Sequence, residues 1–140
     1  MKYVYVTRRA RFNAAHKLWN DDWSQEKNLE VFGKCANPNW HGHNYELHVT
    51  VKGIPNKDTG YCMDLKDLKG IIKERVEEPL DHRNINLDVP WMKGVRTSTE
   101  NLLIAIWDQL TGPVSETGCQ LHRIRLFETE NNYADYYGGE

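Results

Sequence analysis

The chain has 140 residues, a net charge of −2, 39% hydrophobic residues and 27% charged residues. This composition predicts one globular domain over residues 1–140, and it argues against nucleic acid or an anionic membrane as the main partner. No run approaches the roughly 20 apolar residues that cross a bilayer. The three cysteines, Cys35, Cys62 and Cys119, form no disulfide framework, and a reducing, cytoplasmic setting is the simplest interpretation.

An alternating pattern predicts a first strand over residues 3–16. Successive side chains of a strand point to opposite faces of a sheet. One face of this strand carries Ala10, Phe12, Ala14 and His16. His16 is therefore expected on the apolar side. Residues 21–33 follow as a loop with a short helical turn, which Ser24 can cap and Gly33 can end.

A second strand is expected over residues 43–52, where apolar and polar side chains alternate again. His41 and His43 have the parity of the apolar set, so both would project from the same face. His48 has the opposite parity, and this excludes it as a partner of the other two.

The next segment predicts a turn, a strand and a helix. A turn at residues 56–60 leads into a short third strand around residues 61–63. Apolar residues then recur at helical spacing over residues 65–78. Asp64 can cap this helix, and Pro79 ends the pattern.

The last segment predicts a second helix and a final strand. The helix follows Thr97-Ser98-Thr99-Glu100, which has the form of a capping box. Gly112-Pro113 would close it. The final strand covers residues 120–129, and Glu128 shares its apolar face. A carboxylate in that position needs a partner, because an unpaired buried charge is costly.

The order of these elements indicates the fold class. Three strands, two helices and a strand predict an α+β domain with a four-stranded antiparallel sheet and two helices on one face. The core of such a domain is thin, and one sheet face and the sheet edges stay exposed. Exposed edges favour assembly with other copies of the chain.

Three histidines share a face and suggest a metal site. Histidine is the commonest metal ligand. Neutral imidazoles of His16, His41 and His43 would leave one position open on a tetrahedral zinc ion, which is typical of catalytic zinc. The alternative is three unrelated histidines. Cys35 stands six residues before His41; it is a candidate base or nucleophile, or else a small buried hydrophobic residue.

Two acidic residues, Asp81 and Glu128, each allow more than one interpretation. Asp81 precedes His82, and an aspartate can fix the tautomer of a histidine. Adjacent residues often point apart, so the residues alone favour a solvated loop. Glu128 could accept two parallel N–H bonds from a planar guanidine-like group. That group could belong to an arginine or to a ligand such as a pterin or guanine.

Five segments carry a resemblance to a known family. They are Phe12–His16, Phe32–Tyr45, Pro79–Asn84, Ser98–Asn101 and Phe127–Asn132. Through them the chain resembles the 6-pyruvoyl tetrahydropterin synthases and their relatives, the 6-carboxy-tetrahydropterin synthases, from about residue 10 to the C-terminus. There are two departures from the pattern. Trp40 stands where relatives often carry glycine, and Ser98 stands where the animal enzymes carry threonine.

The resemblance implies a site and an assembly. It implies zinc on His16, His41 and His43, and 7,8-dihydroneopterin triphosphate as the substrate. It further implies that proton transfer is carried out by Cys35, Asp81 and His82. The pterin ring would be bound by Glu128, Ser98 and Thr99. It also implies the tunnelling fold (T-fold), in which trimers join their sheets into a barrel and stack as a homohexamer with active sites between subunits.

The resemblance leaves the product open. One branch of the family eliminates triphosphate and keeps the side chain as 6-pyruvoyl tetrahydropterin, in tetrahydrobiopterin biosynthesis. The other also releases acetaldehyde and leaves a 6-carboxy group, in queuosine biosynthesis. The segment Asn37-Pro38-Asn39 favours the first branch. A non-catalytic pterin- or metal-binding module is a third alternative, against which the presence of Cys35, Asp81 and His82 argues.

Overall fold

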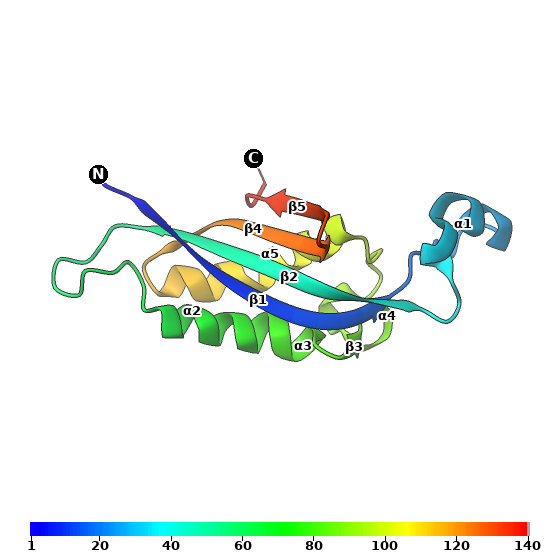
Figure 1. Ribbon diagram of the computed structural model, residues 1–140, viewed down its shortest axis with the longest axis horizontal. Coiled ribbons are helices and arrows are strands. Elements are labelled where there is room, and N and C mark those ends of the chain that lie inside the picture. The colour runs from blue at the N-terminus through cyan, green and yellow to red at the C-terminus, as the bar shows by residue number, and fades with distance from the viewer. Residues whose placement is uncertain (140) are drawn as a thin grey trace.

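The computed structural model describes residues 1–139, in which a twisted five-stranded sheet carries helices on one face (Figure 1). The strands are β1 (Val4–His16), β2 (His41–Gly53), β3 (Arg83–Asn84), β4 (Gln120–Thr129) and β5 (Asn132–Tyr136). Their order across the sheet is β3-β1-β2-β4-β5. All neighbours are antiparallel except β3, which runs parallel to β1. The α+β class is confirmed, with five strands instead of four.

The helices form one layer against the sheet, apart from a small helix at one end (Figure 1). They are α1 (Gln25–Phe32), α2 (Leu65–Ile72), α3 (Glu78–Leu80), α4 (Ile85–Asp88) and α5 (Thr99–Glu116). A π-helical turn, Lys73–Glu77, joins α2 to α3, and short 3-10 turns cover Gly33–Ala36 and Pro90–Met92. Within residues 1–139, none of these helices is long and apolar enough to span a bilayer.

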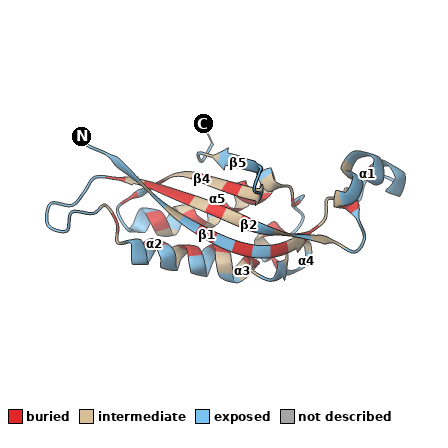
Figure 2. Cartoon of the chain, viewed as in Figure 1, coloured by how far each residue is buried: buried red, intermediate tan, exposed pale blue. Residues whose placement is uncertain are grey.

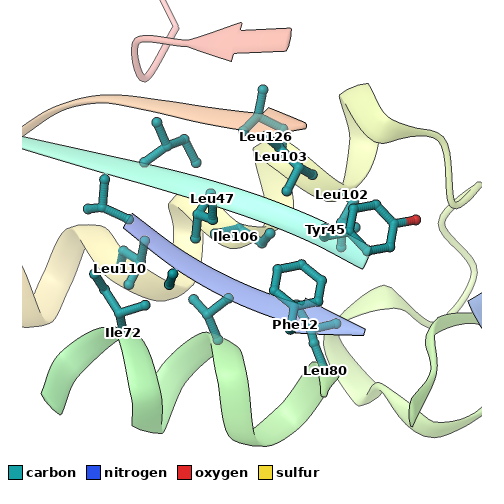
Figure 3. Close-up of a cluster of buried hydrophobic side chains, with 14 of the residues drawn as sticks. Phe12, Tyr45, Leu47, Ile72, Leu80, Leu102, Leu103, Ile106, Leu110 and Leu126 are labelled. Atoms are coloured by element: carbon teal, nitrogen blue, oxygen red, sulfur yellow. The ribbon is translucent and has the colours of Figure 1, made fainter. Parts of the chain in front are cut away.

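The alternation predicted for the two long strands is confirmed. Buried and exposed residues alternate along β1 (Figure 2). The buried side chains of β1 and β2 meet those of α2, α3 and α5 in one core, in which Phe12 and Tyr45 stack with ring centroids 5.0 Å apart (Figure 3). Each fully buried large apolar side chain contributes about 1.5–3 kcal/mol. The core therefore fixes which face of β1 and β2 points toward the helices.

The predicted third strand at residues 61–63 is wrong. Its backbone closes the preceding turn, because the Tyr61 carbonyl accepts a hydrogen bond from the Asn56 N–H at 3.1 Å. The Cys62 carbonyl accepts one from the Cys119 thiol at 3.0 Å. Both edges of β2 are already paired, with β1 and β4. The segment thus has no place in the sheet beside the strand that precedes it.

Pro79 does not end the first long helix, which continues to Leu80. In the turn before it, the Glu78 N–H bonds to the Lys73 carbonyl, five residues back. A proline ring crowds the carbonyl four residues earlier, and this wider turn gives the ring room. Leu80 is fully buried and holds the last turn against the core. The cap predicted at Asp64 is confirmed by its bond from the Lys66 N–H.

Gly112-Pro113 likewise does not close α5, which ends at Glu116. The fully buried Val114 holds the turn after the proline against the core. The N-cap of α5 is Ser98, one residue after the first residue of the predicted capping box. Its hydroxyl oxygen accepts a hydrogen bond from the Asn101 N–H at 3.2 Å.

Trp40 occupies an unusual backbone conformation just before β2. Its φ angle is +67°, a region that favours glycine. The Lys17 Nζ atom lies 4.6 Å from the centroid of the Trp40 ring, a geometry in which cation and ring attract each other. The angle gives a physical reason why glycine suits this position, and the ring contact helps to hold tryptophan there.

Two substitutions separate the backbone strain from the ring. Because both remove the indole, Trp40→Gly is expected to be more stable than Trp40→Ala by about 1 kcal/mol. At a position with a negative φ angle, the alanine variant would be the more stable of the two. Urea unfolding of both variants measures the difference. If Trp40→Ala is the more stable variant, the positive φ angle carries no strain.

Candidate metal centre and active site

The three predicted histidines come together at the end of the sheet. His16, the last residue of β1, pairs with His41, the first residue of β2, and His43 follows on the same face. One ligand nitrogen from each lies within 4.8 Å of those of the other two. His16 is only 1% exposed. His48 lies outside the cluster, as predicted, and contacts Glu46 at 2.8 Å.

The donor atoms of this cluster fit a metal ion. His16 Nε2, His41 Nδ1 and His43 Nε2 are buried and have no hydrogen-bond partner within residues 1–139. The other His16 nitrogen, Nδ1, lies 2.7 Å from the Thr97 carbonyl. If Nδ1 donates its proton to that carbonyl, Nε2 of the neutral ring carries a free lone pair. Ligand histidines are usually oriented by a hydrogen bond of this kind. Three such atoms side by side suit a cation.

The electrostatics favour the neutral form of two of these rings, His16 and His41. Burial lowers the pKa of His16 below its ordinary value of 6.5, and the neighbouring His41 lowers it further. Burial, followed by His43, also lowers the pKa of His41. A metal binds the neutral ring. Two of the three donors are therefore held in the form that binds a cation at neutral pH.

The same lowered pKa values predict a pH dependence of stability in chelator-treated protein. Unfolded histidines take up protons below pH 6.5, whereas folded His16 and His41 resist protonation. Their contribution is thus present above pH 6.5 and is lost as the pH falls through the lowered folded values. Urea unfolding should show that the free energy of unfolding falls as the pH is lowered through this window. The fall should be less steep in His16→Asn than in the unaltered chain. A free energy that is flat or rises on acidification would contradict this.

Glu128 lies beside the histidine cluster at the N-terminal end of α5. Its Oε2 atom accepts a hydrogen bond from the Thr99 hydroxyl at 2.6 Å. Its Oε1 atom lies 3.7 Å from His43 Nε2. The side chain is 28% exposed. Among residues 1–139 its hydrogen-bond and ion-pair partners are therefore Thr99 and His43. None of the ion pairs there joins it to an arginine. Of the predicted pterin residues, Thr99 and Glu128 are brought together, with Ser98 adjacent.

Cys35 lies in the 3-10 turn that precedes β2 and is partly exposed. Its carbonyl accepts a hydrogen bond from the Leu18 N–H at 2.7 Å. Leu18 follows His16 by two residues. This bond therefore ties the Cys35 turn to the segment that leaves the histidine cluster.

Asp81 and His82 contact each other, although adjacent residues often point apart. His82 Nδ1 lies 2.9 Å from an Asp81 carboxylate oxygen. The other oxygen accepts a hydrogen bond from the Asn13 N–H, and this bond is the main reason why the pKa of Asp81 is lowered. The His82 N–H donates to the Asn13 carbonyl. β1 thus fixes the loop, while the His82 side chain is 82% exposed.

Some residues around the cluster carried no sequence signal. The Thr97 contact is made by a carbonyl, which every residue has. Asn86 bonds both the N–H and the carbonyl of Lys17, immediately after His16. Tyr45 is buried with its hydroxyl unpaired in the described chain, and its ring lies 5.5 Å from the His43 ring. The sequence places Tyr45 on the apolar face of its strand but does not indicate that it lies beside His43.

A cleft of about 560 Å³ lies next to this cluster. Its wall includes Thr97, whose carbonyl contacts His16, and two cationic side chains, Lys17 and Arg96. Trp19 and Trp40 contribute aromatic surface. The wall also carries two carboxylates, Asp21 and Asp22, so the charges of the cleft are balanced.

An α+β sheet with an open three-histidine centre beside a carboxylate defines a candidate metalloenzyme. A family profile described as 6-pyruvoyl tetrahydropterin synthase matches residues 5–139, and the chain belongs to this family.

The relatives agree with this assignment. The chain is 45% identical over 135 residues to the 6-pyruvoyl tetrahydrobiopterin synthase of Dictyostelium discoideum, covering 96% of each chain. It is 45% identical over 133 residues to that of Homo sapiens, covering 95% of this chain and 90% of that one. The solved structure of Caenorhabditis elegans 6-pyruvoyl tetrahydropterin synthase superposes with a TM-score of 0.92 at 34% identity, covering 99% and 98% of the two chains. The 6-carboxy-5,6,7,8-tetrahydropterin synthase of Haemophilus influenzae is more distant, at 26% identity over 155 residues, 94% of this chain and 96% of that one.

Proposed function

We propose that this chain is a zinc-dependent 6-pyruvoyl tetrahydropterin synthase that eliminates triphosphate from 7,8-dihydroneopterin triphosphate. The observation that carries the proposal is the buried cluster of His16, His41 and His43 beside Glu128. The 45% identity to synthases of that name supports the 6-pyruvoyl product. The 6-carboxy enzyme is the second candidate, and its lower identity of 26% is the reason for ranking it second.

The histidine cluster would hold the metal. Three neutral nitrogen donors suit zinc and leave an open position for substrate. When bound, zinc would supply a Lewis acid to the oxygens of the substrate side chain. The contact between His16 and the Thr97 carbonyl would keep the ring oriented toward it.

Glu128 would hold the pterin ring. A carboxylate matches the two parallel N–H donors of the guanidine-like edge of a pterin. Thr99 donates to one carboxylate oxygen and so limits the rotation of the group. Because Glu128 lies 3.7 Å from His43, a pterin bound to it would lie beside the histidine cluster. Ser98, the N-cap of α5, would add a polar contact from the same helix end.

Cys35 would take a proton from the substrate side chain as its thiolate. General acid-base transfers of this kind typically contribute about 10²–10⁴-fold to a rate. Asp81 orients His82, and the pair would return or relay the proton. The exposed His82 could reach a site on a neighbouring subunit, which agrees with a catalytic role in an assembly.

The assembly we propose is a homohexamer of two trimers, in which the sheets join into a barrel. The short β3 and the five-residue β5 lie at the two edges of the sheet. Such edges can pair with those of another copy. The setting we propose is the cytoplasm, where the three cysteines would be kept as thiols.

The role of Glu128 can be tested by Glu128→Gln. An amide cannot accept both N–H bonds of the pterin, so we expect a pterin Kd that rises by about 10–100-fold. Glu130→Gln is the matched control, because Glu130 is an exposed carboxylate two residues away. Fluorescence titration with an unreactive pterin gives both affinities, and metal analysis checks that the histidine cluster is intact. Equal affinity of the two variants would remove Glu128 from the pterin site.

Turnover tests the proposal against a non-catalytic module. Zinc-loaded protein incubated anaerobically with 7,8-dihydroneopterin triphosphate should release inorganic triphosphate, and chelator-treated protein should not. Binding of the substrate without any release of triphosphate would identify a binding module instead.

A further inference from the structure

Two cysteines meet at the end of the molecule that lies away from the histidine cluster. Cys62 lies in the loop between β2 and α2, and Cys119 immediately precedes β4. This loop projects from one end of the fold, whereas α1 and the Cys35 turn lie at the other (Figure 1). The Cys119 thiol donates a hydrogen bond to the Cys62 carbonyl at 3.0 Å. The pair is thus brought together by contacts between segments that are distant in sequence.

Gly53, the last residue of β2, shows how close the two side chains are. A Cβ atom on this glycine would lie 3.0 Å from Cys119 Sγ, 3.0 Å from Cys62 Cβ and 3.6 Å from Cys62 Sγ. Both sulfurs therefore adjoin the same small volume, which the missing side chain leaves free. Gly53 is outside the set of residues with a positive φ angle. The need for glycine here is a need for space between the two cysteines.

The two thiols differ in their access to solvent. Cys119 is buried, with 8% exposure, whereas Cys62 is partly exposed. Burial raises the pKa of the Cys119 thiol, and the nearby Cys62 raises it further. A small oxidant would therefore meet Cys62 first. Cys119 is placed behind it as a resolving thiol.

We propose that Cys62 and Cys119 form an oxidation site, at which a peroxide converts the two thiols into a reversible disulfide within one chain. The Cys62 thiolate attacks one peroxide oxygen and the O–O bond breaks, which gives a sulfenic acid and hydroxide; the hydroxide becomes water by taking up the proton that the Cys62 thiol released. The Cys119 sulfur then attacks the Cys62 sulfur, the S–O bond breaks and a second water leaves. Two thiols are oxidised and one hydrogen peroxide is reduced. A thiol reductant reverses the step by exchange.

The bond would tie the loop after β2 to the start of β4. The two residues are 57 positions apart, so the disulfide would close a long covalent loop. Constraining a loop of this length in the unfolded chain should raise the Tm by about 5 °C or more. The metal centre lies at the other end of β2, so the bond should form without loss of bound metal. The inference is independent of the proposed reaction.

The test is a controlled oxidation of the full chain. Reduced protein is treated with hydrogen peroxide, free thiols are blocked by alkylation, and peptides are mapped without reduction. We expect a linked pair of peptides containing Cys62 and Cys119, a loss of two free thiols, a higher Tm and reversal of all three by dithiothreitol. Cys35→Ser should still form the link. Cys62→Ser and Cys119→Ser should not form it and should keep the lower Tm.

Other oxidation patterns would overturn the inference. These are oxygen addition to separate cysteines without a link, a link that includes Cys35, and a link between two chains. The map of the unaltered chain decides among them even if a serine variant folds poorly.

Discussion

Replacing Cys35 by alanine is expected to lower the single-turnover rate constant of triphosphate release by about 10³-fold while metal and pterin stay bound. In this proposal the Cys35 thiolate takes the proton from the substrate side chain, whereas Asp81 and His82 return or relay it. Cys35 holds neither the metal nor the pterin ring in this proposal. Its turn is fixed through the backbone, by the bond from Leu18 to the Cys35 carbonyl, and alanine keeps that bond. The measurement is single-turnover release of triphosphate by zinc-loaded protein.

Cys62→Ala is the matched control for this experiment. Cys62 is also a partly exposed free thiol, but it lies in the loop at the opposite end of the fold. The control should retain the full rate. If Cys35→Ala turns over as fast as the control, the proton is taken by another group and the proposed role of Cys35 is wrong.

His41→Ala is expected to weaken metal binding by about 10²-fold or more and to abolish turnover. The variant removes one of three donors from the cluster, and even the loss of a group that only supports a ligand typically costs about 10–100-fold in affinity. His41 is the first residue of β2, and unlike His16 it is only partly buried, so the fold should tolerate alanine. Competition with a coloured chelator gives the affinity, and elemental analysis identifies the metal and its stoichiometry.

His48→Ala provides the control on the same strand. His48 is partly buried like His41 but has the opposite parity, and it contacts Glu46 on the other face of the sheet. Its loss should leave one metal ion per chain. Equal metal content in the two variants would mean that the histidine cluster is not the binding site.

The sequence carried enough information to place the histidine cluster. Strand alternation is a local property, so the parity of His16, His41 and His43 follows from the residues beside them. The structure adds the register, in which His16 pairs directly with His41. Glu128 was likewise assigned to the correct face, but its contact with Thr99 depends on how α5 packs against β4 and could not be derived from either segment alone.

The errors arose where distant contacts outweigh local signals. Pro79 and Pro113 are strong breakers in sequence, yet the buried Leu80 and Val114 hold both helices past them. The two residues of β3 are too few for any periodicity, and they become a strand only by pairing with Ala14–Ala15 of β1. Local patterns could not predict such pairings.

The Asp-His loop shows the same limit at the site. The residues alone favour a solvated loop for Asp81 and His82, with which their exposed side chains agree, and only the family resemblance implies a role. The bond from Asn13 to Asp81, across 68 positions, orients the pair. A contact over that separation leaves no trace in the spacing of the two residues.

Product analysis tests the central proposal most directly. Zinc-loaded protein would be incubated anaerobically with 7,8-dihydroneopterin triphosphate, and triphosphate, acetaldehyde and the mass of the pterin would be measured together. We predict triphosphate and a pterin that retains its three-carbon side chain, without acetaldehyde. Acetaldehyde in an amount equal to triphosphate, with a 6-carboxy pterin, would contradict the proposal and identify the 6-carboxy enzyme.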